Sequence, residues 1–112
     1  MMKKAVSYSP ERAYFIAIKD EPTYLYLFFE YHHNGVKCWR LTSKIERIKL
    51  LTQCTTITTQ NSQYVLAITH FIFKNLSMDE FLYCKNGITP DEVTMITALK
   101  KVSITSSNRS LK

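Results

Sequence analysis

The sequence predicts an α+β fold: a three-stranded antiparallel meander, with strands near 13–19, 24–33 and 36–42, followed by three to four helices packed on one face of the sheet. Two observations support this prediction. Asn34-Gly35, the dipeptide most typical of a type I′ hairpin turn, stands between two runs of aromatic and β-favouring residues. Downstream of these strands, the chain changes to helix start signals and to apolar residues spaced three and four apart.

The two-residue loop at Asn34-Gly35 also sets the register of the predicted hairpin. The facing pairs should be Phe28 with Leu41, Phe29 with Arg40, Glu30 with Trp39, Tyr31 with Cys38, His32 with Lys37 and His33 with Val36. Because successive side chains on a strand point to opposite faces, the hairpin has two different surfaces. The predicted core face carries Leu25, Leu27, Phe29, Tyr31, Val36 and Cys38, with Arg40 at its end. The opposite face is aromatic yet charged, and carries Tyr24, Tyr26, Phe28, Trp39 and Leu41 among Glu30, His32 and Lys37.

Residues 13–19 are expected to join this hairpin as the third strand of the meander. A four-residue loop would place Ile18 opposite Leu25 and Ile16 opposite Leu27. This register predicts that both isoleucines extend the core face.

The segment 44–53 is predicted to be a helix. Ser43 and Glu46 have the spacing of a capping box, and apolar residues follow at helical spacing. The alternative is a fourth strand, which would place Ile45 and Arg47 on the same face.

The chain between residues 54 and 76 contains the predicted central helix. Residues 54–60 are β-branched and polar, and a short edge strand and an extended connection both remain open. Apolar residues then recur at three and four positions, which predicts a buried helix over 63–75.

Two further helix start signals follow in the C-terminal third of the chain. Ser77 and Glu80 repeat the capping-box pattern and predict a short helix that ends near Gly87. Thr89 as N-cap and Pro90 at the first helical position predict the last helix.

The length of 112 residues predicts one domain over 1–102 and a flexible, basic tail over 103–112. Fifteen Lys and Arg against nine Asp and Glu give a net charge of +6. Such a balance favours acidic partners, among them nucleic acid.

The segment 79–99 resembles a degenerate helix-turn-helix motif, a resemblance that covers about a fifth of the chain. Gly87 stands in the turn, and the apolar positions of the motif hold Leu82, Ile88, Val93 and Ile96. The segment departs from the motif at Tyr83, where a small residue is usual, and at Asn86, where an apolar one is usual. The resemblance implies DNA binding, although two acids open the helix that should meet the DNA.

No catalytic or cofactor motif is found. The only glycines, Gly35 and Gly87, have turn or cap roles, so a glycine-rich phosphate loop is excluded. His32, His33 and Cys38 are the nearest approach to a metal site, but the hairpin register places His32 and Cys38 on opposite faces. We therefore expect no enzyme activity, no cofactor and no metal.

The three cysteines, Cys38, Cys54 and Cys84, form no CxxC pair, and no signal peptide or membrane-spanning run is recognised. This pattern predicts a soluble protein of the reducing cytoplasm, without a membrane partner.

The expected function is that of a small, non-enzymatic binding or regulatory module that acts on nucleic acid or on a nucleic-acid-associated complex. The alternative is a protein-binding inhibitor or adaptor with an acidic partner surface, the class that includes immunity proteins and phage anti-defence proteins. A homodimer through the aromatic face is also possible. The candidate binding surface combines aromatic and basic residues: Tyr24, Tyr26, Lys37, Trp39, Arg40, Lys44, Arg47, Lys49, Lys100 and Lys101.

Overall fold

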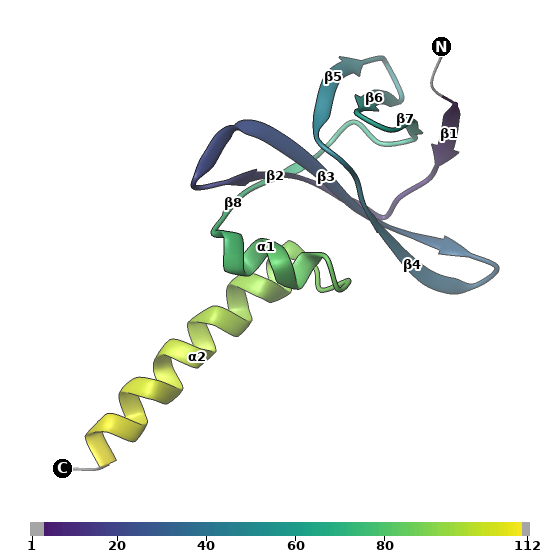
Figure 1. Cartoon of the computed structure of the whole chain (residues 1–112). Coiled ribbons are helices and arrows are strands. Elements are labelled where there is room, and N and C mark those ends of the chain that lie inside the picture. The colour runs from purple at the N-terminus through teal and green to yellow at the C-terminus, as the bar shows by residue number, and fades with distance from the viewer. Residues whose placement is uncertain (1–3, 111–112) are drawn as a thin grey trace.

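The structure is a computed structural model that describes residues 4–110, with side chains for these residues except Pro22 and 101–110. It is mainly β, with eight strands and two C-terminal helices, so the predicted α+β fold is wrong (Figure 1). The elements are β1 (Ala5–Tyr8), β2 (Arg12–Ile18), β3 (Glu21–His33), β4 (Val36–Leu41), β5 (Ile45–Leu50), β6 (Thr55–Thr59), β7 (Gln63–Leu66), β8 (Ile72–Leu76), α1 (Met78–Cys84) and α2 (Pro90–Ser110).

The strands form two four-stranded mixed sheets. Sheet A has the order β1-β7-β6-β5 and sheet B the order β4-β3-β2-β8. In each sheet one edge pair is parallel, β1 with β7 and β2 with β8, and the other pairs are antiparallel. The expected meander of β2, β3 and β4 therefore exists, but only as part of a larger sheet.

The predicted hairpin register is confirmed at all six expected pairs of β3 and β4. Asn34 and Gly35 form the turn with positive φ angles of 53° and 77°. This dipeptide meets the requirement of a type I′ turn for two residues in the left-handed region.

The predicted register between β2 and β3 is wrong by one residue. The expected pairs were Ile16 with Leu27 and Ile18 with Leu25, and the observed pairs are Ile16 with Tyr26 and Ile18 with Glu21. The chain turns from β2 into β3 through two residues instead of four, and the register shifts again at the end of β2. A one-residue slip exchanges the two faces, so Ile16 and Ile18 lie on the aromatic face.

Sheet B is consequently buried on both faces, which corrects the expectation of a single core face. The aromatic face packs against the helices in one hydrophobic core, formed by Tyr14, Ile16, Ile18, Phe28, Leu76, Phe81, Cys84 and Val93. The opposite face packs against sheet A in a second core, formed by Ala13, Leu27, Phe29, Ile57, Tyr64 and Leu66.

The helix predicted over 44–53 is wrong, because this segment contains strand β5. Ser43 does not act as a cap: its hydroxyl accepts a hydrogen bond from the backbone N–H of Asn61. A register irregularity between Ile45 and Arg47 lets β5 pair with β6. Pairing with the next strand along the chain thus overrides the helix signal within the segment.

The helix predicted over 63–75 is also wrong, since β7 and β8 occupy this segment. In β7, Tyr64 and Leu66 alternate with more exposed neighbours and face the core between the sheets. The recurrence at three and four residues arose from two strands separated by a loop. The open segment 54–60 forms β6, which lies between β5 and β7.

Both C-terminal helix starts are confirmed. Ser77 and Glu80 form the complete capping box of α1. Thr89 accepts a hydrogen bond from the backbone N–H of Glu92 at 3.2 Å, and Pro90 begins α2. The backbone of α2 is helical to Ser110 and extends away from the sheets (Figure 1). The division between a domain and a tail at residue 102 stays a prediction.

Within the described part of the chain, neither helix combines the length and the apolar character needed to cross a membrane.

The first turn of α2 is anchored to sheet B through Asp91. Its carboxylate accepts a hydrogen bond of 2.9 Å from the Tyr14 hydroxyl and forms ion pairs with Lys74 at 2.8 Å and Arg12 at 3.4 Å. The bond from Lys74, opposed in part by burial and assisted by Tyr14, lowers the pKa of Asp91. Burial and the bond to Asp91 raise the pKa of Tyr14 to about 12, so its hydroxyl remains a donor.

This anchoring bears on the helix-turn-helix resemblance. A recognition helix presents its N-terminal residues to the major groove. Here Pro90 and Val93 are buried and Asp91 is bonded to sheet B. The start of α2 is therefore directed at the protein's own sheet.

We expect Asp91→Asn to destabilise the protein at pH 7 by about 1 kcal/mol, a value discounted for the partial exposure of the carboxylate. The pKa of Asp91 is lower in the folded protein than in the unfolded chain. The ionised carboxylate therefore stabilises the fold at pH values above the ordinary carboxyl pKa, and this stabilisation is lost as the pH falls through the pKa of the folded state. Urea unfolding of parent and variant from pH 7 to pH 3 measures this difference. Asp79→Asn, in the first turn of α1, is the control. A gap between parent and Asp91→Asn that stays constant with pH would contradict the assignment.

Candidate functional site

A cavity of about 480 Å³ opens between the β3–β4 hairpin and α1. We call it the aromatic pocket. Its lining combines aromatic side chains, hydroxyl groups and one lysine: Tyr26, Trp39, Leu41, Thr42, Ser43, Phe81 and Lys85. Aromatic rings beside hydroxyl and ammonium groups are suited to hold a planar ligand that carries polar or anionic groups.

The hairpin register places the aromatic residues of the pocket. Trp39 lies on the same face as Phe28, and the two rings are stacked with centroids 5.9 Å apart and an interplanar angle of 10°. Tyr26 packs on Phe81 of α1 with centroids 4.7 Å apart. Phe28 is fully buried, whereas Trp39 remains 41% exposed. Trp39 is thus held in place by Phe28 and remains partly accessible to a ligand.

Gly87, in the turn between the helices, closes one side of Trp39. Its φ of +91° lies in the left-handed region, and a Cβ atom there would lie 2.5 Å from the Nε1 atom of Trp39. Only glycine satisfies both conditions. The predicted role of Gly87 as a turn residue is confirmed, and its contact with the indole adds a second constraint.

Two lysines give the neighbourhood of the pocket a positive charge. The ammonium group of Lys85 lies 5.5 Å from the centroid of the Phe81 ring. Lys44, which follows the lining residue Ser43, lies 3.7 Å from the centroid of the Tyr24 ring. Both contacts are in the range of cation–π interactions and hold the cations beside aromatic surfaces.

The hydroxyl groups of Thr42 and Tyr26 have different roles in the pocket. Thr42 donates to the backbone oxygen of Ser43 at 2.8 Å and accepts from the backbone N–H of Leu27 at 3.2 Å. Burial, followed by the nearby charge of Glu21, raises the pKa of Tyr26, whose hydroxyl therefore stays a donor. The Thr42 hydroxyl is thus bonded to the protein backbone, whereas the Tyr26 hydroxyl is the group that can donate to a ligand.

The structure brings together only part of the predicted binding surface. Tyr26 and Trp39 line the aromatic pocket, and Lys44 lies against Tyr24. Lys37 forms an ion pair with Glu30 at 3.2 Å.

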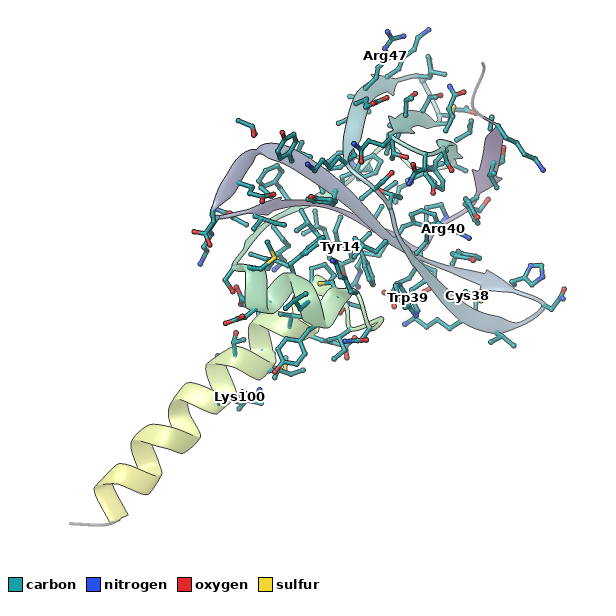
Figure 2. The ribbon with its side chains drawn as sticks, viewed as in Figure 1. Tyr14, Cys38, Trp39, Arg40, Arg47 and Lys100 are labelled. Atoms are coloured by element: carbon teal, nitrogen blue, oxygen red, sulfur yellow. The ribbon has the colours of Figure 1, made fainter. Side chains whose placement is uncertain are left out.

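The other predicted basic residues lie elsewhere. Arg40 points to the opposite face of sheet B, near Tyr8. Arg47 belongs to β5, as does Lys49, and Lys100 belongs to α2 beside Tyr83. Figure 2 shows Arg47 at the top of the view, in sheet A, and Lys100 well apart from it, part-way along α2. The side chain of Lys101 is outside the described residues.

Sequence reasoning missed Phe81 and Lys85 as parts of the site. They stand four residues apart on the helix that was predicted from Ser77, a spacing that places them on one face. That spacing was the available signal, but the packing of α1 beside Trp39 was needed to interpret it.

Other candidate chemistry is weak. His32 lies 2.6 Å from the carboxylate of Glu11, and no group of three metal-ligating residues gathers within the described residues. Burial raises the pKa of the Cys84 thiol to about 12, so it is not poised as a nucleophile.

Comparison with protein-family models, with curated proteins and with solved structures gives no significant match.

We expect Gly87→Ala to cost more stability than Gly35→Ala. Both glycines have positive φ, and the strain alone should cost roughly 1 kcal/mol. At Gly35 a Cβ atom meets nothing within 4 Å, whereas at Gly87 it collides with Trp39. Only Gly87→Ala should also alter the fluorescence of Trp39.

Urea unfolding and emission spectra of the two variants provide the measurement. Equal losses of stability, with unchanged Trp39 emission in both variants, would show that the turn does not seat the indole.

Proposed function

We propose that this protein is a non-catalytic binding or regulatory module for single-stranded nucleic acid, and that an unpaired base occupies the aromatic pocket. The observation that carries the proposal is the position of Trp39, which is stacked on Phe28 and is still 41% exposed. Bases of a single strand stack on exposed aromatic rings of this kind, whatever their identity.

The composition of the pocket supports a nucleotide as the occupant. Its volume of about 480 Å³ suits a small planar group. Lys85 in its lining and Lys44 beside Ser43 offer cations to the adjoining phosphates. A base inside a duplex is already stacked on its neighbours, so we propose unpaired rather than duplex nucleic acid.

A protein partner is the second candidate, in which the chain acts as an inhibitor or adaptor. Large apolar side chains are exposed at two places away from the pocket: Leu50 on β5 is 65% exposed and Met95 on α2 is 64% exposed. Each is an apolar group that a protein partner could cover. A homodimer would have to use the rim around Trp39, since the helices cover Phe28 and the buried part of the aromatic face.

We propose the cytoplasm as the site of action. All three cysteines are free, in agreement with a reducing compartment.

We expect Trp39→Ala to weaken binding of a labelled single strand by roughly 5- to 150-fold, the effect of losing one stacked base. Fluorescence anisotropy measures the affinity, and circular dichroism checks that the variant is folded. Trp39→Phe should retain most of the affinity, because it keeps an aromatic ring. Phe73→Ala, which removes an aromatic side chain that is 62% exposed on β8, is the matched control.

Parent-like affinity in Trp39→Ala, or equal binding of single strand and duplex, would refute the proposal. A stoichiometric protein partner that is lost on changing Leu50 or Met95 would favour the second candidate.

We also expect Lys85→Ala to reduce the salt dependence of binding. Each phosphate contact on a single strand contributes about −0.7 to the slope of log affinity against log salt concentration. Affinities measured over a series of salt concentrations should therefore give a slope that is shallower by about this amount. Lys19→Ala, a lysine in the β2–β3 turn, is the control for a general change of charge. An equal change in slope for both variants would argue against a phosphate at Lys85.

A further inference from the structure

Arg40 lies beside three tyrosines on the face of β4 opposite to Trp39. Its guanidinium carbon is 5.9 Å from the centroid of the Tyr8 ring, and the group lies beside the hydroxyls of Tyr31 and Tyr64. The four side chains come from four strands, β4, β1, β3 and β7, and from both sheets. We call them the Arg40 cluster.

The tyrosines of the cluster are held by packing against one another. The ring of Tyr8 lies 4.7 Å from Tyr31 and 6.2 Å from Tyr64, measured between centroids. Phe29 contacts all three rings from the core side. Tyr64 is only 6% exposed. The hydroxyl groups are therefore positioned before any ligand arrives, which lowers the entropic cost of binding.

Arg40 differs from the other cationic side chains that the structure describes in sheet B, because no described carboxylate forms an ion pair with it. Lys37 is paired with Glu30, and Arg12 and Lys74 are paired with Asp91. Among the side chains that the structure describes, no acidic group forms an ion pair with Arg40, which is exposed to solvent. A guanidinium has five N–H donors, more than two neighbouring hydroxyls can accept.

We propose that the Arg40 cluster binds the phosphate group of a ligand. The planar fork of the guanidinium can donate two parallel hydrogen bonds to phosphate oxygens. Tyrosine hydroxyls next to it can donate to the remaining oxygens. The ligand supplies the negative charge that the protein does not provide at this place.

The phosphate can come from a free ion or from the backbone of the single strand. Only the second source rests on the proposed function. In that case the nucleic-acid strand passes around edge strand β4, with a base at Trp39 and a phosphate at Arg40. Inorganic phosphate has no base to stack, so its binding tests the Arg40 cluster independently of the aromatic pocket.

The experiment is a titration of the full chain with inorganic phosphate at constant ionic strength, with sodium chloride as the reference salt. NMR spectra that detect the Arg40 side-chain N–H groups should show saturable shifts with phosphate and none with chloride. Arg40→Lys keeps the charge but loses the fork, and should bind phosphate about tenfold more weakly. Tyr31→Phe keeps the ring but loses the hydroxyl, and its affinity for phosphate should fall by at least roughly threefold.

Lys19→Gln, which removes a charge in the β2–β3 turn, is the control and should match the parent. Shifts that do not saturate, or equal affinities in the parent and in both cluster variants, would overturn the proposal. Tyr31→Phe retains the ring packing and keeps the test valid if Arg40→Lys does not fold. Displacement of a bound oligonucleotide by phosphate identifies the strand as the source, and phosphate binding without displacement identifies a free phosphate ligand.

Discussion

The alternation of β3 side chains between two cores is the constraint on which the structure depends. Leu27 and Phe29 point toward sheet A, whereas Phe28 and the half-buried Tyr26 point toward the helices. Complete burial of a large apolar side chain contributes about 1.5–3 kcal/mol. Because both faces are covered, a slip of one residue would exchange two sets of side chains that fit different neighbours. The type I′ turn at the end of β3 therefore fixes the register of the hairpin and also decides which β3 side chains enter each core.

The aromatic pocket and the Arg40 cluster are both products of this alternation. Trp39 and Arg40 are neighbours on β4, and their side chains leave the strand on opposite faces. Trp39 lies on the side of sheet B that faces the helices, and Arg40 lies on the side that faces sheet A. The same edge strand thus presents an aromatic ring and a guanidinium group around one narrow border of the molecule (Figure 2).

Local signals in the sequence predicted local structure correctly. The Asn34-Gly35 turn, the capping box at Ser77 and the start of α2 at Pro90 all depend on residues within a few positions of one another. The helix predictions over 44–53 and 63–75 failed because strand pairing decides the structure of these segments. β7 and β8 pair with β1 and β2, which are far away in the sequence, and β5 pairs with the neighbouring strand β6. The spacing of apolar residues within each segment reveals neither kind of pairing.

The candidate site was predictable to the same extent. Face alternation along the hairpin identified Tyr26 and Trp39, since their register follows from the turn. Phe81 and Lys85 could not be found, because they depend on where α1 packs. The basic residues of β5 seemed continuous with Arg40 in the sequence, but β5 belongs to sheet A and takes them away from the hairpin.

The two parallel pairs have a consequence for how the chain acquires its structure during synthesis. Ala5 of β1 pairs with Gln63, and Tyr14 of β2 pairs with Ile72. Neither N-terminal strand can complete its pairing until more than half of the chain has left the ribosome, whereas the β3–β4 hairpin closes locally. Contacts between such distant residues slow folding. The nascent chain must therefore carry β1 and β2 with open edges for much of its synthesis, and that is the interval in which pairing with other chains competes with folding.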